Sequence, residues 1–207
     1  VYHLGAHCTD EEHILRCLLR NRESLADAGI LVPGPARYRN LIRDTATALR
    51  RMPATEETQA QVLDQIMDAQ TAQRLILSWE NFLSFPQWVL RGKLYPAAGE
   101  RVRGFTNIFP SFGAEFHIAI RNPATFLPAL LQRQRGKTVE EFMGGTNPLS
   151  LRWSETITDL IAHSPDTPVT VWCDEDTPLI WPEVLRAIAG IEPGAPLEGE
   201  HEFLASL

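Results

Sequence analysis

Val1-Tyr-His-Leu-Gly-Ala-His-Cys-Thr-Asp-Glu-Glu-His13 opens the chain, and its pattern predicts a short buried strand, a tight turn at Gly5 and a helix that begins near Asp10. Nucleotide-binding α/β proteins place a phosphate loop in such a unit, because bare backbone N–H groups and a helix N-terminus attract anions. This loop, however, carries Asp10, Glu11 and Glu12 and no lysine. The architecture therefore predicts a phosphate site, whereas the charge of the loop opposes a bound phosphate.

Length and composition predict one globular domain over residues 1–207. A chain of 207 residues with 44% hydrophobic and 22% charged residues can bury a sizeable core without a second domain. Its formal net charge of −7 argues against nucleic acid or an anionic membrane as the main partner. Homodimerisation is expected only because two-fold dimers are common among soluble proteins.

Cysteine usage and hydropathy favour a cytoplasmic location. The three cysteines are too few for a disulfide framework, so free thiols in a reducing compartment are expected. No apolar run approaches the length of a membrane span, and no signal segment opens the chain. The chain begins at Val1 rather than Met, as expected where a few native residues precede it.

Apolar runs and helical patterns alternate along the chain. Strands are expected at residues 1–6, 30–32, 74–78, 115–120 and 168–172. Helices are expected at about 10–28, 36–51, 56–72, 123–134, 149–163 and 179–189, with short helices and loops over 82–113 and a loop-like tail over 190–207. This order predicts a three-layer α/β domain, in which helices flank a mostly parallel sheet.

Polar residues follow four of the predicted strands. Ligands of such sheets bind at the carboxyl ends of the strands, so these segments are expected to meet in one cleft. They are Gly5–His13, Ser78–Asn81, Arg121–Pro123 and Cys173–Asp176.

Three segments together resemble the P-loop sulfotransferase family, in particular its bacterial sulfotransferase-like members. The segment His3-Leu-Gly-Ala-His7, with the helix and strand that follow to Gly34, is similar to the first unit of that family. Ala119-Ile-Arg-Asn-Pro123 resembles the strand end whose arginine holds the 3′-phosphate of 3′-phosphoadenosine 5′-phosphosulfate, and 169–178 resembles a later strand with its acidic turn. The resemblance spans about residues 1–190 and implies a cofactor site at Gly5, Ala6, His7, Cys8, Thr9, Asp10, Glu11, Glu12 and Arg121.

The chain departs from the family pattern at residues that would touch this donor. Cys8 stands where the family has a lysine, Asp10 where it has a small residue, and Glu11 and Glu12 where it has hydroxyl residues. That lysine is implied to neutralise the transferring oxygens, a charge that cysteine cannot supply. At an effective dielectric constant of about 20, each pair of like charges ~4 Å apart costs on the order of 4 kcal/mol. A degenerate donor site is therefore predicted.

The second phosphate site is weakened as well. A serine eight residues beyond the family arginine is implied to help bind the 3′-phosphate, and this chain has Ala129 there. Arg121 itself has two interpretations, a phosphate-binding group or a strand-end arginine that pairs with a carboxylate.

The acidic loop has three interpretations of its own. In the first, Asp10 caps the helix and Glu11 and Glu12 stabilise its first turn, so that side chains replace the lost anion. In the second, residues of the loop bind a metal ion, although no pair shows a recognised ligand spacing; the set is His3, His7, Cys8, Asp10, Glu11, Glu12 and His13. In the third, Cys8 is a reactive thiolate, which neighbouring carboxylates would oppose by raising its pKa.

Glu80 and His7 are the candidate catalytic residues. By resemblance, the end of the second long strand lies on the acceptor side, where Glu80 would serve as general base; alternatively, Glu80 caps a turn and Asn81 bonds the backbone. The tryptophans are expected in the core or a cleft wall, the segment Phe105–Phe112 as a lid or partner surface, and Asp174–Asp176 as a solvated turn.

The sequence thus predicts a sulfotransferase-like protein with a degenerate donor site, silent in catalysis or repurposed for binding. One alternative is an active sulfotransferase that uses 3′-phosphoadenosine 5′-phosphosulfate and a carbohydrate, lipid or small hydroxylated acceptor. The other is a metal- or thiol-dependent activity at the altered loop.

Overall fold

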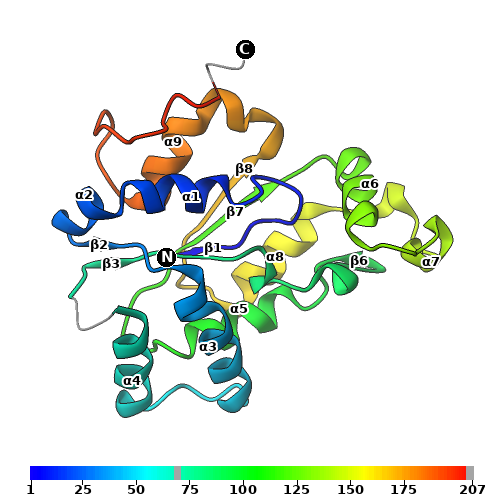
Figure 1. Ribbon diagram of the computed structural model, residues 1–207. Helices are drawn as coiled ribbons and strands as arrows, with labels where there is room; N and C mark the ends of the chain where they lie inside the picture. Colours follow the sequence, from blue (N-terminus) through cyan, green and yellow to red (C-terminus); the bar gives the residue numbers. More distant parts are fainter. Residues whose placement is uncertain (68–70, 204–207) are drawn as a thin grey trace.

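The computed structural model describes residues 1–67 and 71–203 and has helices on both faces of a parallel sheet (Figure 1). The strands are β1 (Tyr2–His3), β2 (Ile30–Leu31), β3 (Arg74–Leu75), β4 (Leu77–Ser78), β5 (Leu90–Arg91), β6 (Lys93–Leu94), β7 (Phe116–Ile120) and β8 (Val169–Cys173). The α-helices are α1 (His13–Arg20), α2 (Arg22–Asp27), α3 (Pro35–Ala48), α4 (Glu56–Met67), α5 (Ala98–Thr106), α6 (Pro123–Arg133), α7 (Val139–Met143), α8 (Trp153–His163) and α9 (Thr177–Ala189). Short 3₁₀ turns are η1 (Glu80–Phe82), η2 (Pro86–Trp88), η3 (Pro148–Ser150) and η4 (Asp174–Asp176).

The central sheet has the strand order β4-β1-β7-β8, and all its pairs are parallel. β2 and β3 form a second parallel pair, and only the β5–β6 hairpin is antiparallel. The predicted α/β class with a mostly parallel sheet is confirmed.

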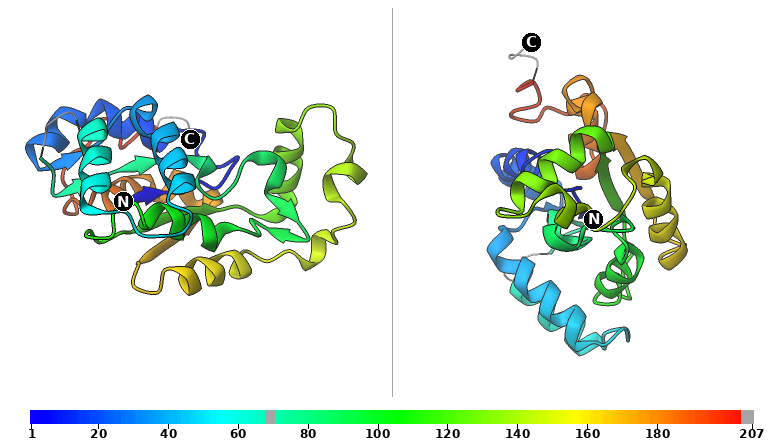
Figure 2. Two further views of the ribbon diagram at one scale, coloured as in Figure 1. Left: turned by 90° about the horizontal axis from the view of Figure 1, so that it is seen from below. Right: turned by 90° about the vertical axis from the view of Figure 1, so that its right-hand side faces the viewer.

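Strand residues alternate between two hydrophobic clusters. Tyr2, Leu77 and Phe116 face a cluster that includes Tyr38 of α3 and Val102 of α5. The intervening strand residues face a second cluster, to which α1, α2 and α9 contribute; it includes Ile14, Leu18, Ile76, Ala119, Trp172, Trp181 and Leu185. Figure 1 shows α1 and α9 on one side of the sheet and α3, α5 and α8 on the other. At one end, α6, α7 and the β5–β6 hairpin form a projection (Figure 2).

The helix expected over residues 10–28 is the clearest error of the sequence analysis. It begins at His13 rather than Asp10, and it breaks at Asn21 into α1 and α2. Asn21 Nδ2 donates to the carbonyl oxygens of Cys17 and Glu198, so the break is held partly by the C-terminal segment. The expected strand over 74–78 is divided into β3, which pairs with β2, and β4, which pairs with β1; the other expected helices and strands are present with shifted ends. The continuation of the helix after Met67 into residues 68–70 lies outside the described residues.

The segment from Gly190 to Phe203 forms no helix or strand, but it is tied to the fold. Trp181 Nε1 donates to the carbonyl oxygen of Gly199, and the Trp181 ring packs edge-on against Phe203. Arg20 forms an ion pair with Glu202. These contacts hold the end of the described chain against α1 and α9. Residues 204–207 of the expected tail lie outside the described residues. Across residues 1–67 and 71–203, none of the helices combines the length and apolar character that a membrane span needs.

Candidate functional site

The four strand ends expected to share a site are in contact through hydrogen bonds. The His7 ring after β1 lies 3.0 Å from the side-chain amide of Asn81 after β4. Arg121 at the end of β7 donates from Nη1 to the carbonyl oxygen of Cys8. The backbone N–H of Asn122 donates to Glu175 Oε1, beyond β8, at 2.8 Å. The parallel sheet thus brings together residues that lie far apart in the sequence.

The turn from β1 into α1 is shaped by backbone conformations that glycine favours. Gly5 has φ +92°, and a Cβ there would lie 3.2 Å from Glu80 Cα and Cβ, so the strand end passes close to η1. Cys8, Glu11 and Glu12 also have positive φ, at 57°, 47° and 65°. Because two of these left-handed residues precede His13, the acidic run forms a turn and not the first turn of α1.

From this turn, Asp10 accepts hydrogen bonds from the backbone N–H groups at the start of α1. Its Oδ2 accepts from the N–H of Ile14 at 3.0 Å, and its carbonyl oxygen accepts from the N–H of His13 at 2.8 Å. Thr9 Oγ1 donates back to the carbonyl oxygen of Ala6 at 2.8 Å. The capping interpretation therefore describes Asp10 but not Glu11 or Glu12, since the first turn of α1 contains no acidic residue.

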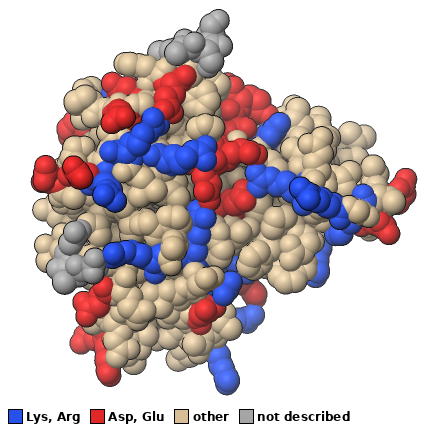
Figure 3. Space-filling view, viewed as in Figure 1, with Lys and Arg blue, Asp and Glu red and all other residues tan. Residues whose placement is uncertain are grey.

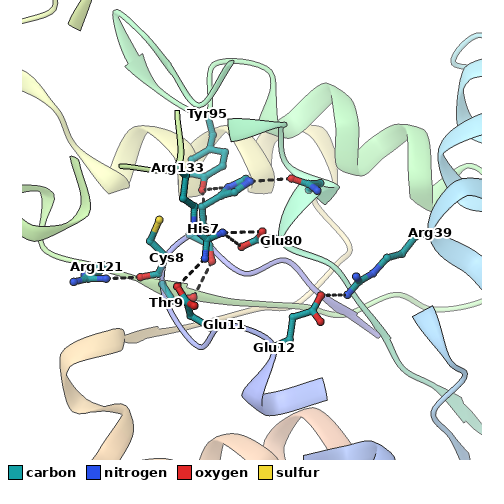
Figure 4. A network of polar contacts seen from close by, with 12 residues as sticks. His7, Cys8, Thr9, Glu11, Glu12, Arg39, Glu80, Tyr95, Arg121 and Arg133 are labelled. Carbon is teal, nitrogen blue, oxygen red and sulfur yellow. Dashed lines mark hydrogen bonds and ion pairs between the residues drawn. The ribbon is translucent and has the colours of Figure 1, made fainter. Parts of the chain in front are cut away.

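Glu11 is bound by an arginine that the sequence analysis did not single out. Arg133, the last residue of α6, donates from Nη2 to Glu11 Oε1 at 2.8 Å and from Nη1 to the Glu80 carboxylate at 2.9 and 2.8 Å (Figure 4). Partial burial acts in the opposite direction, but hydrogen bonds and charges from Glu11 and Glu80 raise the pKa of the guanidinium. One guanidinium thus joins the loop, η1 and α6.

Glu12 is held by a second arginine, on α3. Arg39 Nη2 lies 2.7 Å from Glu12 Oε1 and donates to the carbonyl oxygen of Ser78 at 3.1 Å. This arginine therefore links the start of α1 to the end of β4, next to Glu80. Figure 3 shows acidic and basic side chains side by side across the centre of this face. Each of the two glutamates has its own cationic partner.

Arg121 stabilises the loop through uncharged partners. Besides the Cys8 carbonyl oxygen, its Nε donates to Thr125 Oγ1 at 3.1 Å. Within residues 1–67 and 71–203 it forms no ion pair, so the expected carboxylate pairing is absent there. Nearby, burial raises the pKa of Asp174 to about 6, although the charge of Arg121 acts in the opposite direction. Asp174 is half-buried, unlike the exposed Glu175 beside it, so it departs from the expected solvated turn.

His7 points into the protein rather than toward solvent. It is fully buried, its Nδ1 lies 2.8 Å from Tyr95 Oη, and its backbone N–H donates to the same hydroxyl at 3.0 Å. With its amide oriented to accept from Trp79 Nε1, Asn81 donates to His7 Nε2 at 3.0 Å. Burial lowers the pKa of His7, in keeping with a neutral ring whose proton lies on Nδ1. Both ring nitrogens of this catalytic candidate are therefore occupied by internal partners.

Cys8 is only 3% exposed, and burial raises the pKa of its thiol. Reactive cysteines combine an accessible sulfur with a lowered pKa, so the site opposes a reactive thiolate at Cys8.

The residues of the metal-binding interpretation do not point to one place. The His3 ring is hydrogen-bonded to Ser78, and the His13 ring is hydrogen-bonded to the Asp10 carbonyl oxygen. Among the described residues, no three His, Cys, Asp or Glu side chains converge as a metal-binding group.

The remaining candidates divide between the core and the surface. The Glu80 carboxylate is bound to Arg133 and not to a neighbouring turn, and Ala129 packs against the core from α6. Phe105 and Phe109 are buried, whereas Phe112 is 58% exposed. Four tryptophans are buried as expected, and the fifth, Trp88, is 46% exposed.

Three residues that hold the loop in place were not predicted from the sequence: Arg39, Arg133 and Tyr95. A signal for Arg133 was present, because it ends a helix that starts at the Arg-Asn-Pro strand end. A basic residue in a last turn is, however, ordinary helix chemistry. Nothing local marks Arg39 or Tyr95 as partners of a loop at the start of the chain.

The fold and this geometry define an α/β protein in which the loop after the first strand is neutralised by arginines from two helices. No protein-family model matches the chain, and no curated protein sequence matches it either. Among solved structures, the chain is similar to a sulfotransferase from Alicyclobacillus acidocaldarius, with 12% identity and a TM-score of 0.47. The match covers 99% of this chain and 89% of that one. A likeness at this level assigns no role to any residue.

Proposed function

We propose that the chain is a sulfotransferase-like protein whose donor loop is filled by its own carboxylates, so that it is silent in sulfuryl transfer and serves binding instead. The observation that carries this proposal is the bridge of Glu11, Arg133 and Glu80, together with the pair of Glu12 and Arg39. The sulfotransferase-like part of the proposal rests on the resemblance of the loop and of the Arg121 strand end. The proposed loss of activity rests on the bridge.

The residues present do not fit 3′-phosphoadenosine 5′-phosphosulfate. Around the loop, three arginines face four carboxylates: Arg39, Arg121 and Arg133 against Asp10, Glu11, Glu12 and Glu80. A phosphosulfate would have to displace carboxylates from the cations that already hold them, and it would meet those carboxylates at short range. Cys8 adds no positive charge, since a thiol is neutral or, when ionised, negative, and burial raises its pKa.

Titration calorimetry with adenosine 3′,5′-bisphosphate tests the proposal. The native chain should give no binding heat, whereas Glu11→Gln with Glu12→Gln should gain about tenfold or more in affinity, because Arg39 and part of Arg133 are released. Glu56→Gln with Glu57→Gln, an exposed pair of neighbouring glutamates in α4, is the matched control. Micromolar binding by the native chain would overturn the proposal, as would an equal gain in the control pair.

An active sulfotransferase is the second candidate, and the convergence of three arginines on the loop favours it. Anions are strongly held by such guanidinium groups, which would replace the missing lysine if the glutamates moved away. In that case Glu80 is the remaining candidate general base, and a carbohydrate, lipid or small hydroxylated molecule is the acceptor. A sulfuryl-transfer assay with these three acceptor classes separates the candidates: turnover that Glu80→Gln abolishes establishes the enzyme. The absence of turnover agrees with the leading proposal.

A further inference from the structure

β8 forms one edge of the central sheet and uses only one side of its backbone. All five of its residues pair in parallel with β7, from Phe116 opposite Val169 to Ile120 opposite Cys173. The N–H of Phe116 donates to the carbonyl oxygen of Pro168, so Pro168, and with it Thr170 and Trp172, face β7. The backbone groups of Val169, Val171 and Cys173 therefore face away from the sheet. Among the described residues, no other segment forms hydrogen bonds with these outward-facing backbone groups.

This edge lacks the features that usually protect an edge strand. Its sequence, Val169-Thr-Val-Trp-Cys173, contains no charge, no proline and no glycine, and is rich in β-branched residues. Natural edges are commonly blocked by lysine, proline, a bulge or a covering segment, because a bare edge pairs readily with another strand. Thr170, Val171 and Cys173 are exposed, so no described segment covers this edge.

We propose that β8 pairs with β8 of a second copy of this chain, antiparallel, about a two-fold axis through Val171. In an antiparallel ladder, outward-facing residues must oppose outward-facing residues. Val171 then faces the partner's Val171, and Val169 faces the partner's Cys173. This register satisfies every outward N–H and C=O of the three residues, which is the self-complementarity that a two-fold interface requires.

The side chain at the centre of the strand favours the same occupant. Val171 is apolar and 38% exposed. The residues of the strand carry no charge of their own, although Asp174, Glu175 and Asp176 follow it directly. A second copy presents the same uncharged strand. A charged peptide, in contrast, would meet no opposite charge on β8 that could recognise it.

Sedimentation velocity over a concentration series tests the proposal through Val171→Pro. The N–H of Val171 takes no part in the ladder with β7, so proline is tolerated in the monomer but cannot pair across the axis. The native chain should be a dimer, and the variant should raise the dimer dissociation constant at least tenfold. If proline unfolds the chain, Val171→Lys replaces it, with Leu149→Lys, an 81% exposed apolar position, as the matched control. A monomeric native chain, or variants as dimeric as the control, would overturn the proposal.

Oxidative cross-linking tests the register. Val169→Cys places a thiol opposite the partner's Cys173, at the Cα spacing that a disulfide requires. Oxidation of this variant should give a covalent dimer, whereas Val169→Cys with Cys173→Ser should give none. The native chain should stay uncrosslinked through Cys173, because the two copies of this residue lie on opposite sides of the axis. If the native chain is a dimer but oxidised Val169→Cys gives no covalent dimer, the two copies meet through another surface or register, and the assignment is refuted.

Discussion

The loop after β1 and the buried polar row of His3, Ser78 and His117, which are in register on β1, β4 and β7, begin within four residues of one another, yet they handle charge in opposite ways. In the loop, Glu11 and Glu12 remain near solvent and are compensated by Arg133 and Arg39. In the row, His3 and His117 occupy adjacent strands and are each 3% exposed, and the carboxylate that His117 contacts, Glu115, is already paired with Arg74. The loop compensates its charges with opposite charges, whereas burial in the row disfavours a positive charge on its histidines.

The contacts of the row explain why its histidines stay neutral. His3 Nδ1 lies 2.8 Å from Ser78 Oγ, and its ring stacks on Trp172. His117 Nε2 reaches the Glu115 carboxylate at only 3.4 Å, and that carboxylate is already bound by Arg74. Burial lowers the pKa of His3, and burial lowers the pKa of His117 to about 4.

The largest expected effect is a loss of stability in acid through His117. A folded pKa of about 4, against 6.5 for the ordinary group, means that the unfolded chain takes up the proton first. The stabilisation is complete above pH 6.5 and is lost as the pH falls through about 4, a change of roughly 3 kcal/mol at 1.36 kcal/mol per pKa unit. Urea unfolding measured between pH 7 and 4 gives this slope.

His117→Gln should flatten that slope, because it removes the titrating group. His201→Gln, at an exposed histidine near the end of the described chain, is the control and should leave the slope unchanged. An unchanged slope in the His117 variant would mean that carboxylates alone govern the acid response.

The next effect concerns Arg133, whose loss leaves two carboxylates without their shared cation. Breaking a buried ion pair costs 3–5 kcal/mol; because the side chains of Arg133 and Glu80 are 28% and 29% exposed, we expect a loss of about 2 kcal/mol in Arg133→Met. Urea unfolding at pH 7 measures it. Glu80→Gln in the same background should recover part of the loss, and Arg103→Met, at an exposed arginine of α5, should cost little. Equal stability of Arg133→Met and the native chain would show that the bridge is dispensable.

The fold was largely predictable, because its strands are short apolar runs in an order that only a parallel sheet accommodates. β7 and β8 are continuous five-residue runs, and both were found within one residue of their ends. The break at Asn21 was not predictable, because the carbonyl oxygen and N–H of Glu198 that hold its side chain lie 177 residues away in the chain.

The site was predictable in its position but not in its chemistry. Topology alone places Gly5, Ser78 and Arg121 at one end of the sheet. The ion pairs of the loop, in contrast, join residues 27 and 122 apart (39 − 12 and 133 − 11), and no local pattern selects a partner at that distance. Whether the carboxylates face a ligand or a cation was therefore open until α3 and α6 were placed.

A double-mutant cycle should rank the two halves of the bridge. Arg133 binds both oxygens of Glu80, whose side chain is 29% exposed, but only one oxygen of Glu11, which is 65% exposed. We expect a coupling of about 1 kcal/mol between Arg133 and Glu80 and about 0.3 kcal/mol between Arg133 and Glu11. Urea unfolding of the single and double variants measures both. A stronger coupling to Glu11 would mean that the loop, and not η1, is the main partner of Arg133.

The smallest effect is expected at the pair of Arg39 and Glu12. The Glu12 side chain is 46% exposed, so the ion pair should contribute about 0.5 kcal/mol at low salt and less at high salt, where mobile ions screen it. Glu12→Gln isolates this charge, because Arg39 keeps its hydrogen bond to the Ser78 carbonyl oxygen. Unfolding in low and high sodium chloride should show a difference from the native chain that shrinks with salt. A difference that salt leaves unchanged would instead assign the contribution of Glu12 to the left-handed turn before α1, and the loop would then owe its shape to backbone rather than charge.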